Sequence, residues 1–128
     1  MQVEIISGAD IAPSMGPYSL ATRAGHLIFC AGQGGVDLKS GRLVEGGIRA
    51  QTRQTIHNLQ AVLEEAGSDL SHVMMVTVLL HDWKYFEDMN AVFAECFGER
   101  PPARSTIQTT RWPEDALVAM SAIAVTKD

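Results

Sequence analysis

The longest regular pattern in the sequence runs from Ile48 to Ala66, where apolar or small side chains recur every three or four residues. These side chains belong to Ile48, Thr52, Ile56, Leu59, Val62, Leu63 and Ala66. The spacing predicts an amphipathic helix with one apolar stripe, ending at Gly67. A second stripe predicts a helix from about Tyr85 to Phe97 with Gly98 as its stop, and consists of Phe86, Met89, Phe93, Cys96 and Phe97.

Short runs of β-branched and apolar residues predict strands around these helices. The clearest run is Val73 to Leu80, which is apolar apart from Thr77. The other predicted strands are Val3 to Ile6, Tyr18 to Arg23, His26 to Ala31, Arg104 to Thr109 and Ala116 to Thr126. Prolines and glycines predict a loop from Ala12 to Pro17, a tight hairpin turn at Ala24-Gly25 and a flexible loop from Gly32 to Gly35.

The predicted element order, β-β-β-α-β-α-β-β, indicates one α+β (α/β) domain over residues 1–128. We expect one mixed six-stranded sheet with two helices on one face. The other face has no cover within the chain, yet Val73–Leu80 and Ala116–Val125 are apolar at nearly every position. Such strands are typical of sheets buried on both faces. An uncovered apolar face therefore predicts a partner, and self-association is the simplest one.

The composition and net charge of the chain argue against some classes of function. With 128 residues, of which 46% are hydrophobic and 20% charged, the chain has the values of a globular domain. The net charge is −5 and the basic residues are scattered, which argues against nucleic acid as the main partner. No apolar stretch approaches the ~20 residues that cross a bilayer, and the first residues do not resemble a signal peptide. We interpret Cys30 and Cys96 as buried free thiols and expect a reducing, cytoplasmic location.

Several short motifs occur in a distinctive order along the chain. They are Gly16-Pro17-Tyr18, Leu27 to Gln33, Gln51 to Gln54, Val76 to Val78, Met89-Asn90, Pro102-Ala103-Arg104-Ser105 and Ala122 to Ala124. In this order and spacing they resemble the RidA/YjgF family, also called the endoribonuclease L-PSP-like family, over essentially the whole chain. The resemblance implies a chorismate-mutase-like fold and a homotrimer whose sheets form a central barrel. It also implies a deaminase, a hydrolase that converts reactive imines and enamines to 2-oxo acids and ammonia in clefts between subunits.

Arg104 is the strongest candidate for binding substrate. A planar guanidinium pairs bidentately with a carboxylate and keeps its charge at any working pH. The resemblance makes Arg104 the residue that holds the substrate carboxylate. The residue type alone also allows an arginine whose charge simply extends into solvent.

The remaining binding candidates come from the resemblance. Tyr18 follows a rigid Gly-Pro pair and would line the cleft, although a tyrosine can equally fill the core. Asn90 matches an asparagine of the family, and hydrogen bonding to a backbone loop is the alternative. Gly32 and Gln33 would border the cleft, where backbone amides can meet a carboxylate oxygen. Ala31 stands where the family has a serine that contacts ligand.

The catalytic candidates are the residues that would orient or polarise the attacking water. The resemblance assigns its orientation to the backbone carbonyl of Thr106, where many members have cysteine. The family's water-polarising glutamate is Ser121 here, and loss of a general base typically costs ~10²–10⁴-fold in rate. Gln108 could orient a water instead, because it shares a strand face with Arg104 and Thr106.

The sequence is therefore compatible with two functions. The first is an imine or enamine deaminase that acts on small carboxylate-bearing substrates; the second is a trimer that binds small carboxylates, such as keto acids, without catalysis. The replacement of glutamate by Ser121 separates them. Endoribonuclease activity is disfavoured by the acidic charge and the lack of a basic stripe or stacking platform. The histidines and cysteines show no metal-ligand spacing, so we expect neither a metal nor a cofactor.

Overall fold

The computed structural model describes residues 1–8, 11, 13–110 and 115–128, so Ala12 of the predicted loop lies outside the described residues. Its centre is a six-stranded sheet with the strand order β1-β2-β3-β6-β4-β5. The strands are β1 (Glu4–Ile6), β2 (Ala21–Ala24), β3 (Leu27–Gly34), β4 (Val73–Leu80), β5 (Ala103–Gln108) and β6 (Val118–Val125). The pair β4 and β5 is parallel and the other neighbouring pairs are antiparallel, so the predicted mixed sheet is confirmed.

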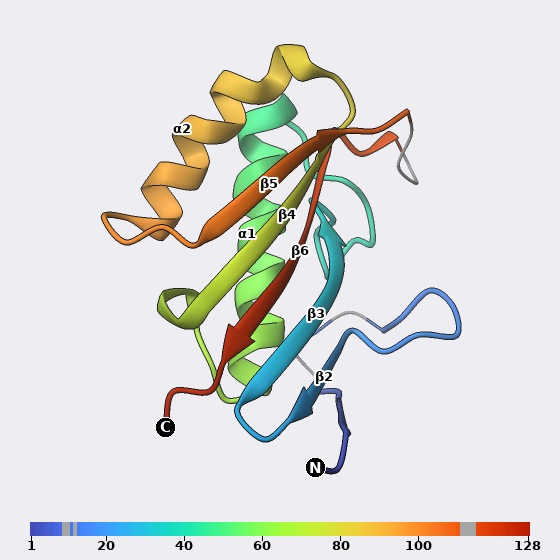
Figure 1. The fold of residues 1–128 in the computed structure, drawn as a ribbon. Helices are drawn as coiled ribbons and strands as arrows, with labels where there is room; N and C mark the ends of the chain where they lie inside the picture. Colours follow the sequence, from blue (N-terminus) through green and yellow to red (C-terminus); the bar gives the residue numbers. More distant parts are fainter. Residues whose placement is uncertain (9–10, 12, 111–114) are drawn as a thin grey trace.

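Two helices, α1 (Gly47–Glu65) and α2 (Phe86–Phe97), lie on the same face of this sheet and contact each other (Figure 1). Helix α1 packs on β3 and β6, and α2 lies beside β5 at the sheet edge (Figure 1). The predicted layers and both helix positions are thus confirmed. Two short 3-10 helices, η1 (Leu70–His72) and η2 (Trp83–Tyr85), were not predicted.

The predicted loop from Gly32 to Gly35 is the main error in the strand assignment. Strand β3 continues to Gly34, because its ladder with β6 resumes at Gln33 and Gly34 after a register shift beyond Cys30. Glycine is tolerated in a strand at such a bulge. Gly35 follows where the chain passes close to α1: a Cβ atom there would lie 2.8 Å from the backbone oxygen of Gln51.

The core lies between the sheet and the helices. Along β4, Val76, Val78 and Leu80 are fully buried, whereas the residues between them are only half-buried. Successive side chains of a strand point to opposite faces of the sheet. The alternation therefore shows which residues of β4 face the helices and which face the other way. The other sheet face is not covered by the described residues, as predicted. It leaves Phe29 49% and Ile107 50% exposed.

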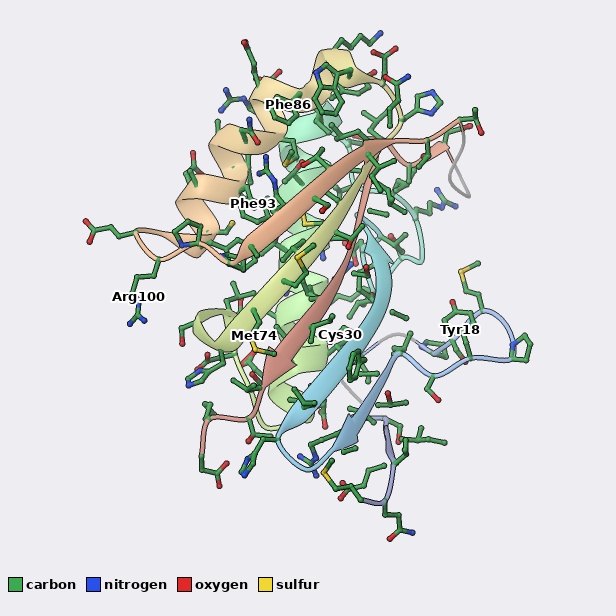
Figure 2. The ribbon with its side chains drawn as sticks, viewed as in Figure 1. Tyr18, Cys30, Met74, Phe86, Phe93 and Arg100 are labelled. Atoms are coloured by element: carbon green, nitrogen blue, oxygen red, sulfur yellow. The ribbon has the colours of Figure 1, made fainter. Side chains whose placement is uncertain are left out.

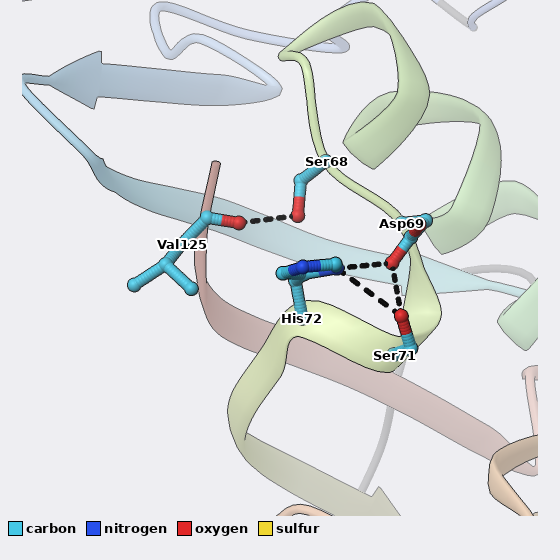
Figure 3. A network of polar contacts seen from close by, with 5 residues as sticks. All are labelled: Ser68, Asp69, Ser71, His72 and Val125. Atoms are coloured by element: carbon cyan, nitrogen blue, oxygen red, sulfur yellow. Dashed lines mark hydrogen bonds and ion pairs between the residues drawn. The ribbon is translucent and has the colours of Figure 1, made fainter. Parts of the chain in front are cut away.

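A polar network ties the connection between α1 and β4 to the end of β6 (Figure 3). The Ser68 hydroxyl donates to the Val125 backbone oxygen at 2.6 Å. Asp69 Oδ1 accepts from Ser71 Oγ at 2.7 Å and lies 2.6 Å from His72 Nδ1. The hydrogen bonds from His72 and then Ser71 lower the pKa of the Asp69 carboxyl.

The cysteines are free, as predicted: Cys30 is buried, which raises its thiol pKa to about 12, whereas Cys96 is only half-buried. Among the helices of the described residues, none is long and apolar enough to cross a membrane.

Candidate functional site

Arg104 lies on β5, the edge strand of the sheet. It stands opposite Val76, which is buried beneath the helices, so its side chain points toward α2. Its Nη2 donates a hydrogen bond to Asn90 Oδ1 at 2.6 Å, and its Nη1 lies 3.9 Å from Met89 Sδ. The Asn90 side chain therefore holds the Arg104 guanidinium, and this is the role of Asn90 instead of a hydrogen bond to a backbone loop.

Two aromatic rings of α2 flank this guanidinium. Its Cζ lies 4.8 Å from the ring centroid of Phe93 and 5.7 Å from that of Phe86. Figure 2 shows both phenylalanines along α2. The partial burial lowers the pKa of Arg104, but an arginine remains charged in a protein.

The guanidinium keeps donors for a ligand. An arginine has five N–H donors in a planar fork, and the oxygen that Arg104 meets among the described residues belongs to Asn90. The half-buried setting strengthens a charge-assisted pair relative to one in bulk water. The geometry thus suits bidentate binding of a carboxylate.

Thr106 and Gln108 follow Arg104 on the same face of β5. Gln108 Oε1 accepts a hydrogen bond from the Trp83 backbone N–H at 2.6 Å, which joins the strand end to η2. The Trp83 ring stacks on Phe86 with centroids 4.4 Å apart. The carbonyl oxygen of Gln108 is thus already engaged by the protein.

Ser121 lies on the opposite face of the sheet from Arg104. It pairs with Thr77, which stands between the helix-facing Val76 and Val78, so both hydroxyls point to the uncovered face. Ala31 and Gly32 lie next to Ser121, in the part of β3 where the register shifts. No sequence pattern indicated this separation.

Tyr18 and Gln33 belong to different surroundings. Tyr18 is 48% exposed on the loop before β2, and its hydroxyl accepts from the Met15 N–H at 3.2 Å. It is therefore not a core residue, and it lies far from the two labelled phenylalanines (Figure 2). Gln33 is only 7% exposed and shares the helix-covered face with its partner Met120. Its Nε2 has no hydrogen-bond partner among the described residues.

The fold thus divides the predicted site residues into separate groups. The group between α2 and β5 consists of Asn90, Arg104, Thr106 and Gln108; the group on the uncovered face consists of Ala31, Gly32 and Ser121, with Tyr18 on its own loop. The sequence analysis missed the aromatic surroundings of Arg104. The stripe that contains Phe86 and Phe93 predicted a helix, but its spacing gave no sign that both rings would lie beside Arg104. In the described part of the chain, no three His, Cys, Asp or Glu side chains gather as a metal site would require.

The family model described as endoribonuclease L-PSP matches residues 9–126. The chain belongs to this family, the RidA/YjgF family. One member, a RutC family protein of Pyrococcus horikoshii, is 46% identical over 94% of this chain and 96% of its own length. The human 2-iminobutanoate/2-iminopropanoate deaminase is 34% identical over 94% of this chain and 88% of its own.

Solved structures of RidA/YjgF proteins share the fold described above. A putative endoribonuclease of Thermotoga maritima superposes with a TM-score of 0.93 at 34% identity, covering 100% of both chains. Escherichia coli TdcF with bound serine gives a TM-score of 0.91 at 28% identity, covering 97% of this chain and 99% of its own. The fold of this chain is therefore that of its family.

Proposed function

We propose that this protein hydrolyses small carboxylate-bearing imines and enamines to 2-oxo acids and ammonia, in clefts between the subunits of a homotrimer. The observation that carries this proposal is Arg104, a half-buried guanidinium held by Asn90 with donors left for a carboxylate. The human relative named 2-iminobutanoate/2-iminopropanoate deaminase supports the reaction, and the serine bound to TdcF supports a small amino-acid-like ligand.

The division of the site residues supports a cleft between subunits. Arg104 and Ser121 lie on opposite faces of one sheet, so a site that uses both must take them from different copies. Arg104 belongs to an edge strand, and the uncovered face near Ser121 exposes apolar residues such as Phe29. Packing this face against neighbouring copies removes apolar surface from water, which favours association.

In the proposed reaction, Arg104 holds the carboxylate and thereby positions the adjacent imine carbon. A water molecule attacks that carbon, and the electron pair of the C=N bond moves to nitrogen, which takes up a proton. The resulting tetrahedral carbinolamine expels ammonia as its hydroxyl becomes the carbonyl of the 2-oxo acid. The backbone carbonyl of Thr106 orients the water, and fixed orientation of this kind lowers the barrier.

The size of the rate enhancement depends on Ser121, which stands where the family has a glutamate. A serine hydroxyl from the neighbouring copy can accept a hydrogen bond from the attacking water, but it lacks the basicity to remove a proton at neutral pH. A missing general base lowers the rate by about 10²–10⁴-fold. This residue is also the observation that favours the second candidate function, a trimer that binds keto acids without turning them over.

The test couples an amino-acid oxidase to the purified protein, so that 2-iminobutyrate forms from 2-aminobutyrate and its disappearance is followed. We expect the wild type to accelerate imine loss, Arg104→Ala to abolish the acceleration, and Arg104→Lys to retain part of it, because an ammonium cannot reproduce the planar fork. Leu38→Ala, which alters an exposed turn residue, serves as the matched control.

Calorimetry with 2-oxobutyrate separates the two candidate functions. Binding that requires Arg104, without acceleration of imine loss, supports the non-catalytic trimer. Acceleration that survives Arg104→Ala contradicts the assigned site altogether.

A further inference from the structure

Trp83 presents an exposed indole beside the Arg104 centre. This residue is 48% exposed, although tryptophan is usually well buried. Its ring stacks on Phe86 with an interplanar angle of 17°, and the Phe86 centroid lies 5.7 Å from Arg104 Cζ. The Arg104 guanidinium, the Phe86 ring and the Trp83 indole thus lie one after another.

The backbone that carries the indole is held from two directions. The Trp83 backbone N–H donates to Gln108 Oε1 at 2.6 Å, which joins η2 to the end of β5. On the helix side, Asp82 Oδ1 accepts from the Lys84 backbone N–H at 2.9 Å, and the Asp82 backbone oxygen accepts from Tyr85 N–H at 3.1 Å. An indole on a fixed backbone and stacked on Phe86 loses little conformational freedom when a ligand packs against it.

We propose that Trp83, together with Phe86, determines which substrates the site takes, and favours carboxylates that carry an aromatic or other planar apolar side chain. This inference rests on the proposed function, in which Arg104 holds the carboxylate. Aromatic rings attract one another at centroid separations of about 4.5–7 Å. The stack begins beside Arg104, since the Phe86 centroid lies 5.7 Å from Arg104 Cζ, so it offers an apolar surface for a ring attached close to the imine carbon. A polar or charged side chain packed on the two rings would exchange hydration for an apolar surface.

A purely structural role for Trp83 makes a different prediction. If the indole only shields Phe86, its replacement lowers the melting temperature and changes the affinity for every carboxylate by the same factor. A role in selection changes the ratio of affinities between an aromatic and an aliphatic ligand. That ratio is the readout, because a general loss of stability does not move it.

The experiment measures calorimetric dissociation constants for phenylpyruvate and 2-oxobutyrate with the wild type, Trp83→Leu, Trp83→Phe and Gln108→Ala. An aromatic pair contributes about 0.5–1.5 kcal/mol beyond area burial, which corresponds to roughly 2- to 13-fold in affinity. We expect Trp83→Leu to lower the preference for phenylpyruvate by that factor and Trp83→Phe to keep most of it. Gln108→Ala should lower it partly, because η2 loses its anchor on β5.

The controls distinguish failure of this inference from failure of the proposed function. Leu38→Ala should leave both affinities unchanged, and Arg104→Ala should remove both. Equal ratios in the wild type and a folded Trp83→Leu variant, with binding still dependent on Arg104, overturn the role of Trp83 and leave the proposed function intact. A wild type that binds neither ligand contradicts both.

Discussion

The contact between Arg104 and Asn90 gives the sharpest test of the carboxylate site. Arg104 Nη2 donates to Asn90 Oδ1 at 2.6 Å, so Asn90→Asp would place a negative charge where the neutral amide oxygen now lies. That charge pairs with the guanidinium and repels a substrate carboxylate bound on its other edge. Asn90→Ala removes the same hydrogen bond without adding a charge.

Coulomb's law gives the expected size of the repulsion. Two carboxylates about 6.5 Å apart, at an effective dielectric constant of about 20, repel by about 2.5 kcal/mol. Because Arg104 and Asn90 are only half-buried, solvent screening lowers this to about 1–2 kcal/mol. We therefore expect Asn90→Asp to bind 2-oxobutyrate roughly 5- to 30-fold more weakly than Asn90→Ala does.

The assay is calorimetric titration of 2-oxobutyrate at low ionic strength, repeated at high salt, where the difference should shrink. Gln2→Glu adds the same charge at the exposed start of the chain and should have no effect. Thermal melts should show Asn90→Asp at least as stable as Asn90→Ala, since the new ion pair replaces the lost hydrogen bond. Equal affinity of the two variants for 2-oxobutyrate would refute the placement of the carboxylate on Arg104.

Three further predictions concern other parts of the molecule. Ser121→Glu should raise the rate of aliphatic imine hydrolysis by about tenfold or more, since even part of the ~10²–10⁴-fold that a well-placed general base supplies is a gain of this size; a folded variant without any gain counts against the proposed role of this position. Sedimentation equilibrium should give the wild type three times its chain mass of 13.9 kDa, and Phe29→Asp on the uncovered face should yield monomers; a monomeric wild type rules out the cleft between subunits. The pKa of Asp69 is lowered by His72, so Asp69→Asn should reduce the melting temperature at pH values above the ordinary carboxyl value of 3.8, and the difference should fade as the pH drops below it. A difference that grows in acid would show the opposite linkage.

The elements that burial dictates could be predicted from the sequence. The stripes of the two helices and the apolar run of β4 face a common core, so their periodicity carried the needed information. The end of β3 could not be predicted in this way. Whether Gln33 and Gly34 form strand or loop depends on β6, far along the chain, which supplies their partners.

In the site, too, single residues could be predicted from the sequence but their contacts could not. The resemblance identified Arg104 and Asn90 one by one, but their hydrogen bond joins a strand to a helix and depends on the final packing. The anchoring of Trp83 by Gln108 is likewise a long-range contact that no local pattern contains. The placement of Arg104 and Ser121 on opposite faces depends on strand register, because a shift of one residue would exchange the faces.

In the proposed site, Arg104 of one copy and the Ser121 face of another enclose a carboxylate ligand. The most direct measurement is a crystal structure of the protein with 2-oxobutyrate. We expect the ligand carboxylate on the Arg104 guanidinium, next to Asn90, with Ser121 and Gly32 of a neighbouring copy on its other side. A ligand bound away from Arg104, or enclosed by one chain alone, would contradict this account.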